Sequence, residues 1–264
     1  MRFAVQDRLV PGASLRERAE RARRYGFDAV ELSLPAVAEG AHEALRDRIA
    51  VSALCGGYRG WLIDPDPGQI ALARADLREQ LDVAGALGAA CIVVPIWGRT
   101  RNLPGLATGR SREDDAALFV EGLRALAPHA ERSGATLVIE PLNRYQNDLC
   151  NTVAEASDFR AAVGSAAVKV MGDVFHMNME ETDMAAALAA PGDALGYVHV
   201  ADNQRLEPGQ GHVNFAPILR ALEAIRYDGY VGLECLRLSG PADAALPAAL
   251  RVLREGLSRP AGGS

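Results

Sequence analysis

Residues 168–181 read VKVMGDVFHMNMEE. The stretch begins with the pattern of a buried strand and ends in polar and charged residues, and this change decides the fold. Val168 and Val170 suit a pleated sheet, yet Asp173 stands at the tip of the apolar run and His176 follows three residues later. A carboxylate at the end of a buried strand carries a desolvation cost unless a cation meets it. The stretch therefore predicts a strand that delivers a charged group to an internal site.

The same kind of short, β-branched run recurs along the whole chain, and several of the intervening stretches have helical spacing and end in Gly. The predicted strands are residues 3–6, 29–33, 51–57, 91–97, 136–142, 168–174, 196–202 and 230–236. Near-continuous apolar strands that alternate with helices indicate a parallel sheet covered by helices. Eight such units in about 250 residues are typical of a (β/α)8 barrel.

An open, doubly wound sheet is the alternative architecture. It requires a glycine-rich phosphate turn after the first strand, and the segment QDRLVPG is not one. No linker divides the chain, so we interpret residues 1–257 as one TIM-barrel catalytic domain and residues 258–264 as a flexible C-terminal tail.

Composition narrows the class of function. Hydrophobic residues make up 49% of the 264 residues and charged residues 23%, which is typical of a globular protein, and the net charge of −6 argues against a nucleic-acid-binding surface. No apolar stretch suits a signal peptide or a bilayer span, so we expect a cytoplasmic protein with no membrane partner. The four cysteines lack CxxC spacing and are expected to be reduced thiols.

One ionisable residue interrupts the end of each of four consecutive predicted strands. In a barrel these ends point into one common mouth. Three carboxylates crowded together repel one another unless a cation lies between them, so the pattern predicts a divalent metal site. Three oxygens and one imidazole suit Mn²⁺, Mg²⁺ or Co²⁺ better than structural zinc. The predicted ligands are Glu140, Asp173, His199 and Glu234.

Further polar and aromatic residues lie just beyond these strand ends. His176 is expected either to orient a neighbouring group or to bind substrate, and Arg205 begins the loop RLEPGQGH. Aromatic residues that include Trp97 could form the flat apolar wall of a sugar pocket. The long segment 98–115 follows the fourth strand and suits a lid, and its four arginines either bind a phosphate-bearing substrate or are solvated.

These residues resemble a known family. The motifs EPLNRYQNDLCNT, GDVFHMNMEE, VHVADNQRLEPGQGH and GYVGLEC are similar to those of xylose-isomerase-like TIM-barrel sugar isomerases and epimerases, closest to ketose 3-epimerases of the tagatose and psicose type. The resemblance implies one divalent metal, with Mn²⁺ expected and Mg²⁺ or Co²⁺ as alternatives, held by the four predicted ligands. It also implies a sugar substrate contacted by His176 and Arg205, and a homodimer or homotetramer.

One departure from the family pattern concerns substrate choice. Ketose epimerases usually carry a substrate-binding glutamate six residues after the first metal-binding glutamate, where this chain has Gln146. We therefore expect Gln146 and Trp97 among the substrate contacts. The expected reaction is ketose 3-epimerisation through an enediolate, with Glu140 and Glu234 as acid–base groups.

Other reactions remain open with the same site. They are a lyase acting on 3-keto sugars or C-glycosides, and a hydroxypyruvate-type aldose–ketose isomerase. A DNA-repair endonuclease of the same superfamily needs extra histidines at the early strand ends, and here these read ELSLP and LCGGY.

Overall fold

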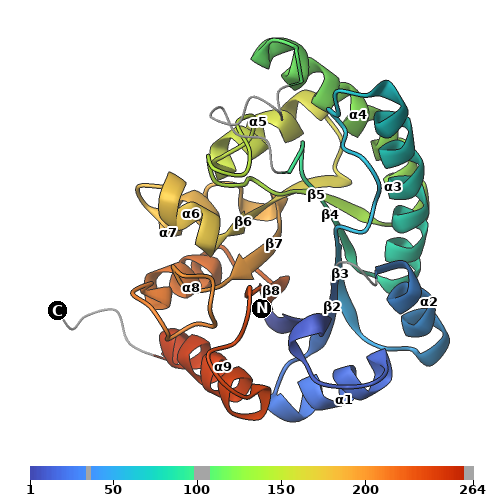
Figure 1. Ribbon diagram of the computed structural model, residues 1–264. Helices are drawn as coiled ribbons and strands as arrows, with labels where there is room; N and C mark the ends of the chain where they lie inside the picture. Colours follow the sequence, from blue (N-terminus) through green and yellow to red (C-terminus); the bar gives the residue numbers. More distant parts are fainter. Residues whose placement is uncertain (34–36, 98–107, 259–264) are drawn as a thin grey trace.

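The computed structural model describes residues 1–33, 37–97 and 108–258. Eight parallel strands close into a barrel in which each strand pairs with its neighbours in the sequence and β1 pairs with β8 (Figure 1). The strands are β1 (Arg2–Gln6), β2 (Ala29–Ser33), β3 (Val51–Cys55), β4 (Ala90–Val93), β5 (Thr136–Ile139), β6 (Val168–Asp173), β7 (Leu195–Val200) and β8 (Tyr230–Leu233). The predicted barrel is confirmed, and each strand begins within one residue of its predicted start.

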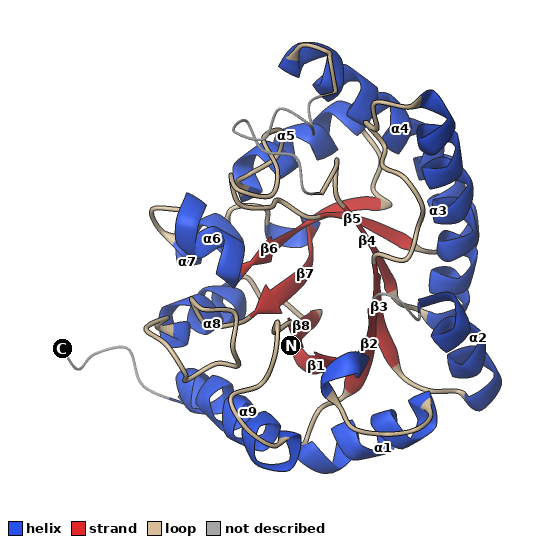
Figure 2. Cartoon of the chain, viewed as in Figure 1, coloured by secondary structure: helices blue, strands red, loops and turns tan. Residues whose placement is uncertain are grey.

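Helices surround the barrel, so that the strands occupy the centre of the molecule (Figure 2). In the described residues they are α1 (Leu15–Tyr25), α2 (Val37–Asp47), α3 (Pro67–Leu87), α4 (Arg112–Ser133), α5 (Val153–Val163), α6 (Val174–Glu180), α7 (Met184–Ala189), α8 (Phe215–Ala224) and α9 (Ala242–Ser258), with short 3-10 turns η1 (Asp7–Leu9) and η3 (Gly192–Ala194). None of these helices is both long enough and apolar enough to cross a membrane. Most of the predicted tail, residues 259–264, lies outside the described residues.

Local signals in the sequence account for the helix boundaries. Helix α5 begins with a capping box, in which the side chain of Thr152 accepts from the backbone N–H of Glu155 and the carboxylate of Glu155 accepts from the backbone N–H of Thr152. Helix α1 ends at Gly26, whose φ of 101° suits a residue without a side chain. The chain then turns directly into β2, which is how one strand–helix unit leads to the next.

Several strands end earlier than the sequence predicts. Pro95 and Pro141 follow β4 and β5 closely, and a proline has no N–H to donate to the sheet. Strand β3 stops at Cys55 because Gly56 and Gly57 adopt positive φ values of 77° and 82°. The affected residues therefore belong to the loops above the barrel, where functional residues collect in this architecture.

Strand alternation explains which residues face the barrel interior. An internal cluster contains Ala53, Ile92, Val138, Met171 and Tyr197. Because side chains alternate between the faces of a strand, the residue two positions further along also points inward. For four of these strands that next residue is, in chain order, Cys55, Glu140, Asp173 and His199. The apolar layer inside the barrel is thus followed by an ionisable layer at its mouth.

The predicted lid lies largely outside the described residues, since residues 98–107 are not among them. Two of its arginines are described, and both pair with carboxylates of helices. Arg110 Nε lies 2.8 Å from Asp115 Oδ1, and Arg112 reaches Glu155 Oε1 at 2.9 Å. These two arginines anchor the start of α4 rather than a phosphate group.

We expect Gly85→Ala to destabilise the protein, because a Cβ there would overlap the backbone carbonyl of Ser133 where α3 packs on α4. Forcing extra volume into a packed contact costs about 1–3 kcal/mol. Urea unfolding would measure the loss. Gly122→Ala is the control, because the atoms nearest to its Cβ would belong to the Leu62 side chain, the first of them 3.3 Å away. Equal stability of the two variants would contradict the prediction.

Candidate active site and metal centre

Four side chains converge at the carboxyl end of the barrel. Glu140 follows β5, Asp173 ends β6, His199 lies in β7 and Glu234 follows β8. One potential ligand atom from each lies within 4.8 Å of the others. The structure thus brings together all four residues that the sequence singled out as metal ligands.

This group places three carboxyl groups close together in the barrel, so that they repel one another when ionised. His199 is fully buried, with Nδ1 3.2 Å from Glu234 Oε2 and 3.6 Å from Glu140 Oε1. Burial lowers the pKa of His199, but the carboxylates of Glu31 and Glu234 outweigh burial and raise the pKa well above its usual value. The imidazole of His199 and the guanidinium of Arg205, which lies 2.8 Å from Glu234 Oε2, are the positive groups that face these carboxylates.

Two buried atoms in this group lack a hydrogen-bond partner in the described residues. The first is Asp173 Oδ2. The other carboxylate oxygen of Asp173, Oδ1, accepts from the backbone N–H of Phe175 at 2.8 Å and so caps the start of α6. The second is His199 Nδ1. Buried polar atoms are normally satisfied, so two orphaned atoms that face one small space fit a bound cation. Three carboxylates and one imidazole suit a divalent metal such as Mn²⁺, Mg²⁺ or Co²⁺.

The two glutamates differ in proton affinity. Burial, together with the nearby charge of Glu234, raises the pKa of Glu140. Burial also acts to raise the pKa of Glu234, but His199 and Arg205 outweigh it and hold that pKa well below its usual value. Arg205 contributes directly, since its guanidinium lies 2.8 Å from Glu234 Oε2. Carboxyl groups held apart in pKa are suited to opposite acid and base roles.

His176 is held in one orientation by Asn143. The backbone N–H and the side-chain amide of Asn143 lie 3.1 Å and 2.7 Å from His176 Nδ1, so that Nδ1 accepts and any proton resides on Nε2. Burial lowers the pKa of His176 to about 4, so the ring is neutral at physiological pH. Nε2 lies 3.4 Å from Asp173 Oδ2, which places it at the edge of the candidate metal site.

Arg205 owes its position to a tightly hydrogen-bonded loop. The fully buried carboxylate of Asp202 accepts from the backbone N–H groups of Asn203, Gly209 and Val213. Arg205 itself adopts a φ of 60°, which is uncommon for a residue with a side chain. Its guanidinium lies 4.6 Å from the centre of the Phe175 ring. The loop and the ring together aim the charge of Arg205 at Glu234.

A cavity of about 830 Å³ opens above these residues. Among the residues that line it are all the predicted catalytic and substrate-binding residues: Glu140, Glu234, His176, Arg205, Gln146 and Trp97. Tyr58 and Trp61 form part of the wall, with their rings edge to face at 5.7 Å. Gln146 Oε1 is buried and has no hydrogen-bond partner in the described chain, so it can accept from a ligand.

Sequence reasoning overlooked the contributions of the first two strands. Gln6 ends β1 and lies 3.1 Å from Glu234 Oε1, while Glu31 in β2 lies 2.8 Å from His199 Nε2. Glu31 carried a usable signal, since it is an ionisable residue inside the apolar run AVELS. Gln6 carried none, because a glutamine at a strand end is ordinary.

Comparison with known proteins places the chain in a family. The sequence profile described as "Xylose isomerase-like TIM barrel" matches residues 19–256. The chain belongs to this family. Within the family it is 33% identical over 251 residues to 3-dehydro-D-guloside 4-epimerase of Escherichia coli K12, a match that covers 92% of this chain and 96% of the relative.

Two further matches from sugar epimerases support this placement. A crystal structure of 3-keto-D-glucoside 4-epimerase from E. coli superimposes with a TM-score of 0.86 at 31% identity, covering 96% of this chain and 98% of that structure. D-psicose 3-epimerase of Enterocloster bolteae is 43% identical over 129 residues, which are 49% of this chain and 43% of the relative. This xylose isomerase-like barrel is therefore a sugar epimerase with a candidate metal site.

We expect divalent metal binding to weaken as the pH falls through about 6. Burial raises the pKa of Asp173 to about 6, so below that pH a proton occupies a ligand oxygen, in addition to the proton that the carboxylates of Glu31 and Glu234 help to retain on His199. Metal must displace these protons, so Mn²⁺ affinity should fall at least about tenfold per pH unit. Isothermal titration of metal-stripped protein between about pH 7.5 and 5.5 would measure the change.

Two variants test whether the binding belongs to this site. His199→Ala should lose most Mn²⁺ binding at every pH, whereas His129→Ala should retain it, because His129 pairs with Asp82 on the outer helices. A pH-independent affinity, or equal binding by both variants, would place the metal elsewhere.

Proposed function

We propose that this sugar epimerase inverts a carbon next to a ketone by way of an enediolate, with Glu140 and Glu234 as the two acid–base groups. The observation that carries the proposal is the pair of glutamates itself. Both carboxyl groups enter one cavity from β5 and β8, and their pKa values are shifted in opposite directions. An epimerase needs such a pair, because one group must accept a proton while the other is ready to donate one.

We assign the base role to Glu234, because the neighbouring guanidinium of Arg205 stabilises its ionised form, and the acid role to Glu140. Ionised Glu234 removes the proton from the carbon beside the ketone, and the electrons of the C–H bond form a carbon–carbon double bond while the carbonyl oxygen gains negative charge. Protonated Glu140 then delivers a proton to the opposite face of the same carbon, and the ketone re-forms. The reverse reaction exchanges the two roles, as an epimerase at equilibrium requires.

Neighbouring residues bind the substrate and stabilise its developing charge. A divalent cation held by Glu140, Asp173, His199 and Glu234, for which we propose Mn²⁺, would polarise the ketone when bound. Arg205 faces the same space and offers a permanent positive charge to a substrate oxygen. Neutral His176 can donate from Nε2, because Asn143 occupies Nδ1.

We favour a 3-keto-glycoside as the substrate, with inversion at carbon 4. This is the class named for the E. coli relative, which matches this chain over nearly its whole length. The cavity of about 830 Å³ also exceeds what one sugar needs. At roughly 30 Å³ per water, such a volume holds about 28 water-sized groups, against about 12 non-hydrogen atoms in a hexose. The remaining space suits the group attached to the anomeric carbon.

Ketose 3-epimerisation is the second candidate, and it is supported by the match to D-psicose 3-epimerase. The chemistry is the same, since a ketose has its ketone at carbon 2 and inverts at carbon 3. Gln146 weighs against it, because ketose epimerases usually carry a glutamate there. An amide offers a free ketose one neutral acceptor in place of a carboxylate.

We predict that Glu140→Gln and Glu234→Gln will each lower kcat by about 10²–10⁴-fold, because glutamine cannot carry the proton. Sugar binding should persist, since the amide keeps the size of the side chain. In D₂O the wild-type enzyme should place deuterium on the inverted carbon. Rates and deuterium content can be followed by NMR with a 3-keto-glucoside as substrate.

Asp115→Asn is the matched control, because it also removes a buried carboxylate but one that pairs with Arg110 at the start of α4, away from the residues that line the cavity. It should retain wild-type turnover. A near-normal rate for Glu234→Gln, together with inversion that incorporates no deuterium, would overturn the two-base mechanism. A product that has lost a substituent would instead identify a lyase, and a product with its carbonyl moved by one carbon would identify an aldose–ketose isomerase.

We further expect the substrate classes to separate in a direct comparison. Wild-type kcat/KM should be higher for methyl 3-keto-glucoside and a 3-keto-disaccharide than for free ketohexoses, assayed with Mn²⁺. Gln146→Glu should shift the ratio toward free ketohexoses, because it restores a carboxylate near the sugar hydroxyls. A wild-type preference for free ketohexoses would establish the ketose 3-epimerase instead.

A further inference from the structure

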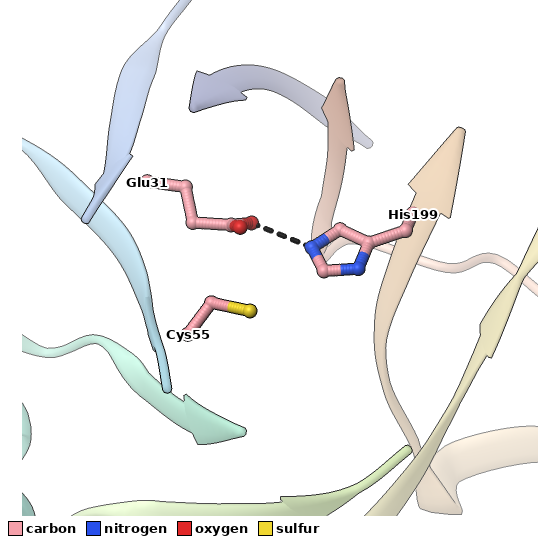
Figure 3. A group of neighbouring side chains, drawn as sticks. All are labelled: Glu31, Cys55 and His199. Carbon is pink, nitrogen blue, oxygen red and sulfur yellow. Dashed lines mark hydrogen bonds and ion pairs between the residues drawn. The ribbon is translucent and has the colours of Figure 1, made fainter. Parts of the chain in front are cut away.

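The carboxylate of Glu31 faces His199 from the side opposite the candidate metal site. Its Oε2 lies 2.8 Å from His199 Nε2, and both side chains are fully buried. Figure 3 shows Glu31, from β2, and Cys55, from β3, reaching across the barrel toward the imidazole ring. The other ring nitrogen, Nδ1, is directed at Glu140 and Glu234.

A chain of hydrogen bonds fixes the direction in which Glu31 acts. Arg8 Nε donates to Gln6 Oε1 at 2.9 Å, so the amide nitrogen of Gln6 must face the other way. That nitrogen donates to Glu31 Oε1 at 2.8 Å and to Glu234 Oε1 at 3.1 Å. The second oxygen of Glu31 is left to accept from His199, and Gln6 links this pair to one of the catalytic glutamates.

The neighbouring strand leaves room for this contact. Gly232 in β8 is the register partner of His199, and a Cβ on it would lie 2.9 Å from Glu31 Oε2 and 2.7 Å from the Tyr197 hydroxyl. The Tyr197 hydroxyl is in turn 2.8 Å from Ser52 Oγ. A side chain at position 232 would therefore displace Glu31 or Tyr197.

We propose that Glu31 is a positioning residue that keeps a hydrogen on Nε2 of His199 and so makes Nδ1 the metal-binding atom. A neutral imidazole presents one lone pair, and the hydrogen bond made by one nitrogen decides which nitrogen carries it. The orphaned, buried Nδ1 is the atom that this arrangement leaves for a cation. The assignment rests on the proposed metal site, but not on the identity of the sugar.

Glu31, Cys55 and His199 could instead form a separate site for a thiophilic cation, since one ligand atom from each lies within 4.8 Å of the others. The hydrogen bonds favour the positioning role. Both oxygens of Glu31 already have donors, and His199 Nε2 already has an acceptor. The orphaned atoms belong to the other group, at Asp173 and at His199 Nδ1.

The test measures metal affinity in metal-stripped protein and locates the hydrogen on His199 by NMR. Glu31→Ala should weaken Mn²⁺ binding about 10–100-fold, the usual cost of removing a hydrogen-bond partner of a metal-binding histidine. Glu31→Gln keeps an acceptor and should fall between Ala and wild type. In wild-type protein loaded with diamagnetic Zn²⁺, a solvent-protected N–H signal should be assigned to Nε2 of His199, and it should be lost in Glu31→Ala.

Two further variants separate positioning from general loss of packing. Asp115→Asn also removes a fully buried carboxylate, but in α4, and it should leave the Mn²⁺ affinity unchanged. Gly232→Ala keeps every charge yet displaces the pair, so it should weaken binding with Glu31 still present.

Three results would overturn the assignment. The first is a Glu31→Ala protein whose Mn²⁺ affinity lies within twofold of wild type. The second is a wild-type Zn²⁺ form with the hydrogen on Nδ1. The third is a second bound equivalent of Zn²⁺ that disappears in Cys55→Ser, which would make Glu31 a ligand. A wild-type protein that binds no divalent metal would refute the metal site itself, whereas inactivity toward every sugar would bear only on the proposed function.

Discussion

The cost of burying three carboxylates around one imidazole is the constraint on which this protein depends. Glu140, Asp173 and Glu234 are held inside the mouth of the barrel, where repulsion between them is poorly screened. His199 offsets part of that repulsion, and the surrounding carboxylates raise its pKa because they stabilise the protonated ring. Two buried atoms of this group without a hydrogen-bond partner in the described residues, Asp173 Oδ2 and His199 Nδ1, fit a further cation. The barrel can place these charges together because its apolar layer below and its helices outside provide the stability that the site itself lacks.

The two glutamates of the site, Glu140 and Glu234, have different pKa values because their surroundings differ. Glu140 and Glu234 are both glutamates after parallel strands, yet Arg205 lies against only one of them. His199, which lies closer to Glu234 than to Glu140, and the contact with Arg205 hold the pKa of Glu234 low, whereas burial raises that of Glu140. This difference supports the proposed proton-donating and proton-accepting roles. The position of Arg205 depends in turn on the loop that Asp202 holds by three backbone hydrogen bonds. Buried Asp202, which is not among the residues that line the cavity, therefore influences the proposed acid–base pair through one arginine.

Membership in the xylose isomerase-like family accounts for the chemistry more completely than for the substrate. Removing a proton beside a ketone requires the same groups whether the ketone is at carbon 2 of a ketose or at carbon 3 of a glycoside. We propose that the difference lies in what surrounds the sugar, namely the size of the cavity and lining residues such as Gln146 and Trp97. Loops above a barrel supply these features, and loops change without disturbing the strands that carry the catalytic residues.

The sequence by itself determined the barrel and the four metal-ligand candidates, because strand periodicity is local and an ionisable residue in an apolar run can be recognised without a structure. It also identified His176 and Arg205 through a family resemblance. Only the tertiary structure decided that Glu31 supports His199 and that Gln6 reaches Glu234, residues separated by 228 positions. These contacts exist because β1 pairs with β8 when the barrel closes. The opposite pKa shifts of the two glutamates were equally beyond the sequence, because they depend on burial and on distances between charges carried by different strands.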